Sequence, residues 1–154
     1  MSSGQQKGSN WRLSPVYLAG LFDGEGCVSI RKTIKNNLDS YTVFASISNT
    51  NIYILKEINK KYGGRLHIDK RSPGRFAACG NWVLLGYDAI KLLKRLHRHT
   101  IIKNDQITVA LNFWKHKEPF HRTNTRKTEG FIEECRRYHV LLKSMHGKQG
   151  KKAD

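Results

Sequence analysis

The stretch Leu18-Ala19-Gly20-Leu21-Phe22-Asp23-Gly24-Glu25-Gly26 ends an apolar run with two acidic residues, each followed by a glycine. Upstream, Ser14 and Pro15 provide a capping side chain and a proline suited to the first position of a helix. A helix is therefore predicted from about Pro15 to Asp23, with Asp23 and Glu25 at its C-terminal end.

Two acids at a helix C-terminus predict a bound cation. The last carbonyl groups of a helix carry a partial negative charge, so nearby carboxylates repel them unless a cation is present. Oxygen ligands around a tight glycine turn suit magnesium or calcium. Gly20 and Gly24 lie one turn apart on one face, a spacing that lets two helices approach closely. The stretch predicts both a metal site and a helix–helix interface.

This stretch resembles the LAGLIDADG motif of homing endonucleases. The identical positions are Leu18, Ala19, Gly20, Leu21, Asp23 and Gly26. Phe22 is a conservative replacement, Gly24 is common in the family, and Glu25 stands where the family usually has its second aspartate. The alternative interpretation is an ordinary amphipathic helix with a glycine-rich acidic end.

Composition favours a nucleic-acid partner. The chain has 154 residues, enough for one domain, and a formal net charge of +16 with a pI near 10.0. Such a surface attracts polyanions, in practice nucleic acid more often than anionic membrane. A ribosomal or nonspecific RNA-binding protein would have a similar charge, so charge alone does not identify the function.

Cysteine usage and hydropathy suggest the setting. The three cysteines are widely spaced and include no CxxC pair, which predicts free thiols in a reducing compartment. No apolar run is long enough to span a bilayer, and no signal-peptide pattern is found. We therefore expect an intracellular protein that acts at DNA without a membrane partner, in an organelle or a prokaryotic cytoplasm.

The order of elements predicts an α+β fold. After the first helix, residues 27–35 and 41–49 alternate as strands around a turn at 36–39. A helix capped by Asn49 or Thr50 follows, then strands within 65–71 and 75–85. Later helices are expected after a cap at Asp88, over 103–114 with Pro119 closing it off, and from Thr128 to Gly147. This is a four-stranded antiparallel sheet with helices on one face.

The same order is that of the αββαββα LAGLIDADG core, so the resemblance extends over about residues 14–114, with extra C-terminal helices. We expect a flexible leader at 1–12, a single endonuclease domain at 13–146 and a basic tail at 147–154. In the strands, Val28, Ile30 and Ile34 are expected to face inward, with Val43, Ala45 and Ile47, and then Leu66 and Ile68.

The opposite face of the predicted sheet is polar and basic. A two-stranded ribbon or sheet fits the DNA major groove, where arginine pairs with guanine and hydroxyl side chains read bases permissively, often through water. By the resemblance, the residues expected to contact DNA are Ser29, Arg31, Thr33, Lys35, Thr42, Ser46, Ser48, Arg65 and His67. Phe44 is also expected on this outer face.

The resemblance also implies the catalytic groups. Glu25 occupies the position of the metal-binding acid, a Gly24 carbonyl would complete the coordination, and Asp23 is expected mainly to organise the helix ends, with metal contact as the alternative. Lys103 matches the family's lysine before a helix, which would help polarise water or neutralise the developing charge on the phosphate. Asn49 matches a water-positioning amide. The alternatives are an ordinary surface lysine and a helix cap.

One acidic helix end per chain implies a homodimer with twofold symmetry, because cutting two strands needs two sites. The interface is expected at Leu18, Gly20, Leu21 and Gly24. The implied function is magnesium-dependent cleavage of both strands of a long, pseudo-palindromic target, with calcium or manganese as substitutes, to promote mobility of an intron. The rival is a cleavage-inactive intron RNA maturase or DNA-binding regulator on the same scaffold.

A zinc site is a weaker alternative. The candidate ligands His97, His99, His116 and His121 have a spacing that fits no common zinc site. His139 and His146 are interpreted as ordinary helix-surface residues. Phe113, Trp114 and Phe120 are expected in the core or beneath the last helix.

Overall fold

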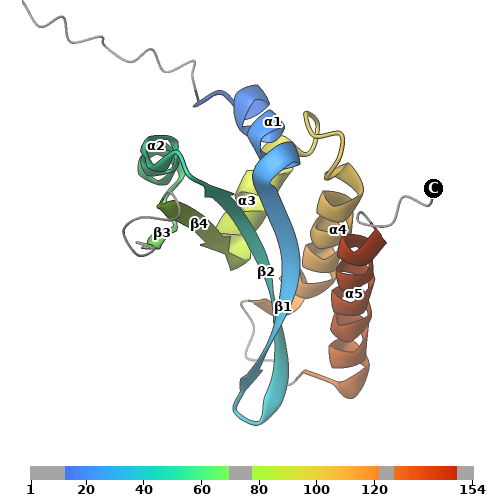
Figure 1. The fold of residues 1–154 in the computed structure, drawn as a ribbon. Coiled ribbons are helices and arrows are strands. Elements are labelled where there is room, and N and C mark those ends of the chain that lie inside the picture. Colours follow the sequence, from blue (N-terminus) through green and yellow to red (C-terminus); the bar gives the residue numbers. More distant parts are fainter. Residues whose placement is uncertain (1–12, 70–77, 122–126, 149–154) are drawn as a thin grey trace, which may run out of the picture.

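The computed structural model describes residues 13–69, 78–121 and 127–148, which form five helices and a four-stranded sheet (Figure 1). The helices are α1 (Pro15–Glu25), α2 (Ile52–Tyr62), α3 (Gly86–Leu96), α4 (Asn104–His121) and α5 (Glu129–Lys148). The strands are β1 (Gly26–Lys35), β2 (Leu38–Asn49), β3 (Arg65–Asp69) and β4 (Cys79–Leu85). The predicted α+β order is confirmed. None of these described helices combines the length and apolar character that crossing a bilayer requires.

The sheet is antiparallel with strand order β1-β2-β4-β3, so β1 and β3 are its edges. Alternation places Val28, Ala45 and Leu84 side by side on the inner face, where all three are buried. This face packs against the helices, with Trp82, Phe22 and Phe113 as the largest fully buried side chains. Figure 1 shows α3 behind the strands and α4 and α5 beside β1.

The β1–β2 hairpin is tighter than predicted. Lys35 pairs with Leu38, so the turn contains only Asn36 and Asn37, whose φ angles are 51° and 59°. Asparagine tolerates this left-handed conformation, and two such residues in a row form the turn that matches strand twist. The end of the hairpin projects beyond the rest of the sheet in Figure 1, with α5 beside it. Ile34 is 75% exposed there, so the prediction that it faces the core is wrong.

The starts of two helices differ from the prediction. The cap of α2 is Asn51, whose side chain accepts from the Ile54 amide at 3.2 Å, rather than Asn49 or Thr50. The residue before α3 is Leu85, which makes no side-chain cap, and Asp88 lies inside the first turn. An acid there still interacts favourably with the positive end of the helix.

The C-terminal ends of two helices also differ from the prediction. The first helix continues to Glu25 because the Gly26 amide still donates to the Phe22 carbonyl. Pro119 lies inside α4 and does not end it. It removes one backbone donor near the helix end, while the rings of Phe120 and Phe131 pack 4.6 Å apart and hold this turn against α5.

Helix α5 covers the open edge of β1. His146 donates from Nε2 to the Val28 carbonyl at 2.8 Å, and His139 donates from Nδ1 to the Ile30 carbonyl. The two histidines are seven residues apart, so they lie two turns apart on one face. The interpretation of them as ordinary surface residues is wrong, because the carbonyl groups of an edge strand need donors.

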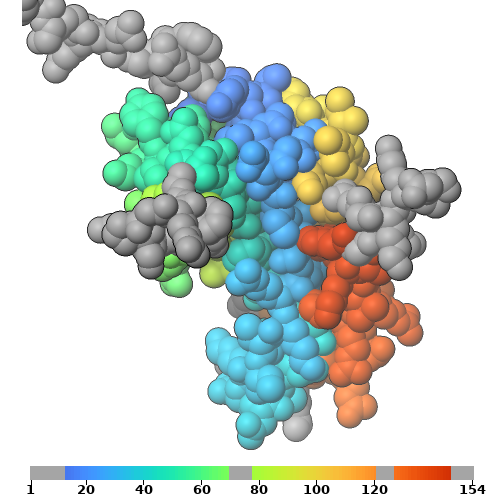
Figure 2. Space-filling view, in the orientation of Figure 1, coloured from blue at the N-terminus to red at the C-terminus, as the bar shows by residue number. Residues whose placement is uncertain are grey.

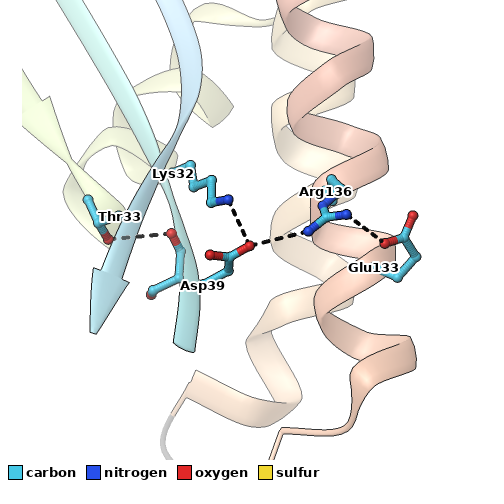
Figure 3. A network of polar contacts seen from close by, with 6 residues as sticks. Lys32, Thr33, Asp39, Glu133 and Arg136 are labelled. Carbon is cyan, nitrogen blue, oxygen red and sulfur yellow. Dashed lines mark hydrogen bonds and ion pairs between the residues drawn. The ribbon is translucent and has the colours of Figure 1, made fainter. Parts of the chain in front are cut away.

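Asp39 ties the hairpin to α5 (Figure 3). Its carboxylate lies 2.9 Å from Lys32 Nζ and 3.4 Å from the Arg136 guanidinium, which also lies 3.6 Å from Glu133. The hydrogen bond from Lys32, with a smaller contribution from Arg136, holds the pKa of Asp39 below its usual value. The ionised form is therefore favoured in the folded protein.

Asp39→Asn is expected to lower the free energy of unfolding at neutral pH and to have little effect in acid. Because the folded-state pKa is lowered, the stabilisation by Asp39 is fully present above the unfolded-state pKa of about 3.9 and disappears as pH falls through the folded value. Urea unfolding of both proteins across this range measures the difference. A difference that does not change with pH would show that charge is not the cause.

Candidate active site and sheet surface

The C-terminal end of α1 presents one free carboxylate. Glu25 is exposed and makes no hydrogen bond or ion pair with any other residue in the described ranges. Gly26 follows directly, and a Cβ atom there would lie 2.4 Å from the Phe22 carbonyl oxygen. Only glycine allows the chain to turn this tightly from α1 into β1, so the motif glycine fixes where Glu25 is presented.

Asp23 has a different environment from Glu25. Its Oδ2 accepts the Ile101 amide at 2.7 Å and its Oδ1 accepts the Lys103 amide at 3.0 Å. The carboxylate therefore joins the end of α1 to the turn between α3 and α4, about eighty residues away in the chain. With both oxygens engaged inside the protomer, this geometry favours the organising role of Asp23 over metal ligation.

Asp23→Ala is expected to lower the free energy of unfolding by about 2 kcal/mol, since hydrogen bonds to a charged acceptor contribute roughly 1.5–3 kcal/mol each and part is recovered from water. Amide hydrogen exchange of Ile101 and Lys103 should accelerate together. Asp23→Asn keeps one oxygen acceptor, so its free energy of unfolding should fall less than that of Asp23→Ala. Unchanged exchange at both amides in the alanine variant would contradict the role of Asp23.

Lys103 lies near the start of β1. Burial raises the pKa of the Cys27 thiol, and the positive charges of Lys103 and Arg31 act in the opposite direction. The geometric link is the Lys103 amide, which donates to Asp23 two residues before Glu25. The fold brings the half-buried Lys103 to the same end of the sheet as the free acid.

Asn49 lies at this end of the sheet as well, two residues beyond Ile47, which pairs with Gly26. Its Oδ1 accepts the Asn51 amide at 2.8 Å, an interaction that shapes the entry to α2. No hydrogen bond joins it to Glu25 or Lys103 in the described structure. The observed contact of Asn49 is structural.

Oxygen donors at the end of α1 suit a hard divalent ion. Glu25 supplies a free carboxylate, and the last carbonyl groups of a helix, including that of Gly24, have no partner within the helix. Within the described ranges no three His, Cys, Asp or Glu residues cluster closely enough to hold a metal. These donors fit magnesium or calcium only if further ligands come from a second protomer, a phosphate or water.

Two of the four histidines considered for zinc, His97 and His116, make other contacts. His97 Nε2 lies 2.8 Å from Thr108 Oγ1, and the His116 ring stacks on Phe131 with centroids 4.9 Å apart. Both contacts hold helices together, so they explain these histidines without a metal.

One face of α1 is unoccupied within the protomer. A Cβ atom at Gly20 or Gly24 would meet no heavy atom within 4 Å, and both glycines are exposed. Val16 and Tyr17, near the start of the helix, are 61% and 48% exposed. Leu21 is half-buried, whereas Leu18 is fully buried in the core. The prediction of Leu18 as an interface residue is therefore wrong.

The outer face of the sheet carries the predicted polar residues, of which only Ser46 is buried. The exposed members are Arg31, Thr33, Lys35, Ser48, Arg65 and His67, and the half-buried ones are Ser29 and Thr42. Ser46 is only 7% exposed because it sits between Cys27 and Val83 on the neighbouring strands, so it is a poor candidate for base contact. Phe44 is 5% exposed beneath Arg31, whose guanidinium carbon lies 3.2 Å from the ring centroid.

Sequence analysis missed Asn81 on this face. Ser48 Oγ donates to Asn81 Oδ1 at 3.2 Å, and Asn81 pairs in register with His67, so the three form a polar row across the sheet. The alternation around Trp82 would have revealed Asn81 if Trp82 had been assigned to the core. Figure 2 shows the part of the outer face formed by β1 and the β1–β2 hairpin, beside α5.

Comparison with solved structures identifies the fold. The homing endonuclease I-CvuI in complex with the I-CreI target matches with a TM-score of 0.67 and 22% identity over 91% of this chain and 85% of that chain. The archaeal intron-encoded homing endonuclease I-Vdi141I complexed with DNA matches with a TM-score of 0.64 and 16% identity, over 91% of this chain and 86% of that chain. The I-SmaMI LAGLIDADG homing endonuclease bound to cleaved DNA matches with a TM-score of 0.66 and 14% identity, over 82% of this chain and 43% of that chain.

The sequence itself matches no family model and no curated protein. At these identities the likeness shows the fold, which is that of LAGLIDADG homing endonucleases.

Proposed function

We propose that this protein is a site-specific DNA endonuclease of the LAGLIDADG type, which hydrolyses both strands of a long, pseudo-palindromic target as a homodimer. The observation that carries the proposal is the end of α1, where the exposed Glu25 carboxylate has no partner among the described residues and neighbouring Asp23 holds the backbone of Lys103 at the same helix end. The glycine face of this helix is open as well. The fold neighbours that are bound to DNA support duplex DNA as the partner.

In the proposed mechanism, Glu25 and the Gly24 carbonyl hold a divalent ion, expected to be magnesium, with calcium or manganese as substitutes. When bound, such an ion polarises the phosphate and activates a water molecule. Lys103 places positive charge where the scissile phosphate gains negative charge. Asp23 keeps Lys103 there through the backbone of its turn. Asn49 is proposed to position water, in addition to its observed bond to Asn51.

Each protomer supplies one motif acid, Glu25, without a described partner, so cutting both strands requires two copies. A twofold interface through Gly20 and Gly24, with Leu21 at its margin, would place two Glu25 carboxylates near the symmetry axis. The exposed Val16 and Tyr17 extend this face with apolar surface. The dimer would bring two basic sheet surfaces against one DNA duplex, one for each half of the target.

The biological role proposed is mobility of the intron that encodes the protein. Glu25 keeps a second function open, because it is one methylene longer than the aspartate usual at this position. A cleavage-inactive intron RNA maturase or DNA-binding regulator would keep the basic sheet face and lose the need for a free acid.

Incubation with magnesium and a plasmid library of candidate insertion sites tests the proposal. We expect a subset of plasmids to be linearised, with cuts on both strands at one position. Binding to a target without any cut product, at every magnesium or manganese concentration, would favour the regulator. Equal binding to all DNA would favour a nonspecific basic protein.

A further inference from the structure

Much of the positive charge lies away from the sheet face. Helices α2 and α3 together carry six basic and two acidic side chains, whereas the exposed cations predicted on the outer face are Arg31, Lys35 and Arg65. Both helices pack on the inner side of the sheet. A duplex lying on the outer face would therefore not contact them.

The cations of the two helices meet at a hollow. A cavity of about 200 Å³ lies between the end of α2 and one face of α3, and its floor includes Leu84, which belongs to the inner face of β4. Its charged lining residues are Lys61, Lys91, Arg95 and Asp88. A helix C-terminus favours basic residues in its last turn, but that preference does not explain why cations from two helices converge on one cavity.

The cations of the hollow remain available to a ligand. Lys61 Nζ donates to the Leu13 carbonyl at 3.0 Å, which fixes its position and leaves two further donors. Lys91 lies 2.7 Å from Asp88, in a pair whose side chains are both about half exposed. Exposed pairs of this kind contribute little and are readily exchanged. Arg95 makes no hydrogen bond or ion pair with any described residue.

An exposed aromatic ring continues this row. Tyr87, Lys91 and Arg95 lie one turn apart along α3. The Tyr87 ring packs against Trp114 with centroids 5.7 Å apart, has Lys91 Nζ 5.2 Å from its centroid, and is still 45% exposed. Cations that contact phosphates, interleaved with an aromatic face on which a base can stack, are the features that bind single-stranded nucleic acid. An acidic peptide would use the cations but not the exposed ring.

We propose that the hollow between α2 and α3 is a second binding site, which takes the phosphodiester backbone of a single-stranded nucleic acid. Arg95 and Lys61 contact phosphates, Lys91 leaves Asp88 to do the same, and Tyr87 stacks on a base. Because this site faces away from the outer sheet surface, a single strand and a duplex can be bound at the same time.

Fluorescence anisotropy with a short labelled single strand tests the site, with separate RNA and DNA arms to identify the preferred sugar. Lys91→Gln with Arg95→Gln should weaken binding roughly 25-fold at ~0.1 M salt and make the salt slope shallower by about 1.4, because each single-strand phosphate contact contributes about 0.7. The matched control is Lys56→Gln with Lys115→Gln, two exposed lysines outside the hollow, which should leave both quantities nearly unchanged.

A sheet variant, Arg31→Gln with Arg65→Gln, should keep single-strand binding, and duplex cleavage by the hollow variant should equal that of the wild type. If neither the wild type nor any variant cleaves DNA, the proposed nuclease function fails, but the second binding site is still tested by the single-strand measurements. Equal losses in the hollow and control variants, or displacement of the oligonucleotide by an equal concentration of polyglutamate, would overturn the second site. Amide shifts of the wild type on titration should fall on α2 and α3, and shifts confined to the sheet would overturn it as well.

Discussion

Glu25→Gln is expected to abolish DNA cleavage in magnesium while leaving DNA affinity in calcium within about twofold of the wild type, since binding rests mainly on phosphate contacts elsewhere. The substitution keeps the size of the side chain and removes only its charge. Glu25 is exposed and makes no hydrogen bond or ion pair with any described residue, so folding should not change. Loss of metal stabilisation worth several kcal/mol predicts a fall of at least about a thousandfold in the cleavage rate.

Single-turnover cleavage of a bound target measures this effect. Glu129→Gln is a matched control, because Glu129 is also an exposed glutamate at a helix end and should leave the rate unchanged. Glu25→Asp restores the residue usual in the family and should retain cleavage. If Glu25→Gln cuts as fast as the wild type, Glu25 is not the metal ligand and the proposed mechanism fails.

Local chemistry made the order of helices and strands predictable. Strand alternation placed Val28 and Ile30 inside, and the asparagine pair at 36–37 marked the hairpin. The need for glycine at position 26 is also local, because a Cβ atom there would collide with the carbonyl oxygen and ring of Phe22, four residues earlier. Each of these features depends on residues close together in the chain, where the spacing of apolar residues and the conformational preferences of single residues are informative.

The features that sequence analysis missed depend on contacts between distant residues. His139 and His146 are donors only because β1 is an edge strand and α5 lies beside it. Ser46 alternates outward as predicted, yet its neighbours in adjacent strands bury it. Leu18 lies in the motif helix, but its direction is set by the core of the same protomer. None of these partners can be read from spacing alone.

The candidate site shows the same division. The sequence identified Glu25 and Lys103 through resemblance, whereas the hydrogen bond between Asp23 and the Lys103 amide is visible only in three dimensions. Asp23 holds the backbone of Lys103 across the fold, so the two acids of the motif have separate environments. One is engaged and structural, and the other is free.

Gly20→Gln is expected to separate the stability of the protomer from that of the dimer. A Cβ atom at Gly20 meets nothing within 4 Å, so a longer side chain fits the isolated protomer. Replacing a glycine inside a helix by a good helix former should stabilise the protomer by about 0.5–1 kcal/mol. The same side chain enters the proposed interface twice, once from each copy, because the interface is twofold.

Overpacking a close contact costs about 1–3 kcal/mol per side chain, so two copies should raise the dimer dissociation constant at least about 30-fold. Sedimentation equilibrium measures the dimer, and urea unfolding at a concentration where both proteins are monomeric measures the protomer. Gly130→Gln is the matched control, since Gly130 lies in α5 with equally open surroundings. Of the two glycine variants, only Gly20→Gln is expected to lose double-strand cleavage, because each protomer supplies one Glu25 and cutting both strands needs two. If Gly20→Gln dimerises with wild-type affinity, the interface lies elsewhere. The two Glu25 carboxylates would then not meet at the symmetry axis, as the mechanism requires.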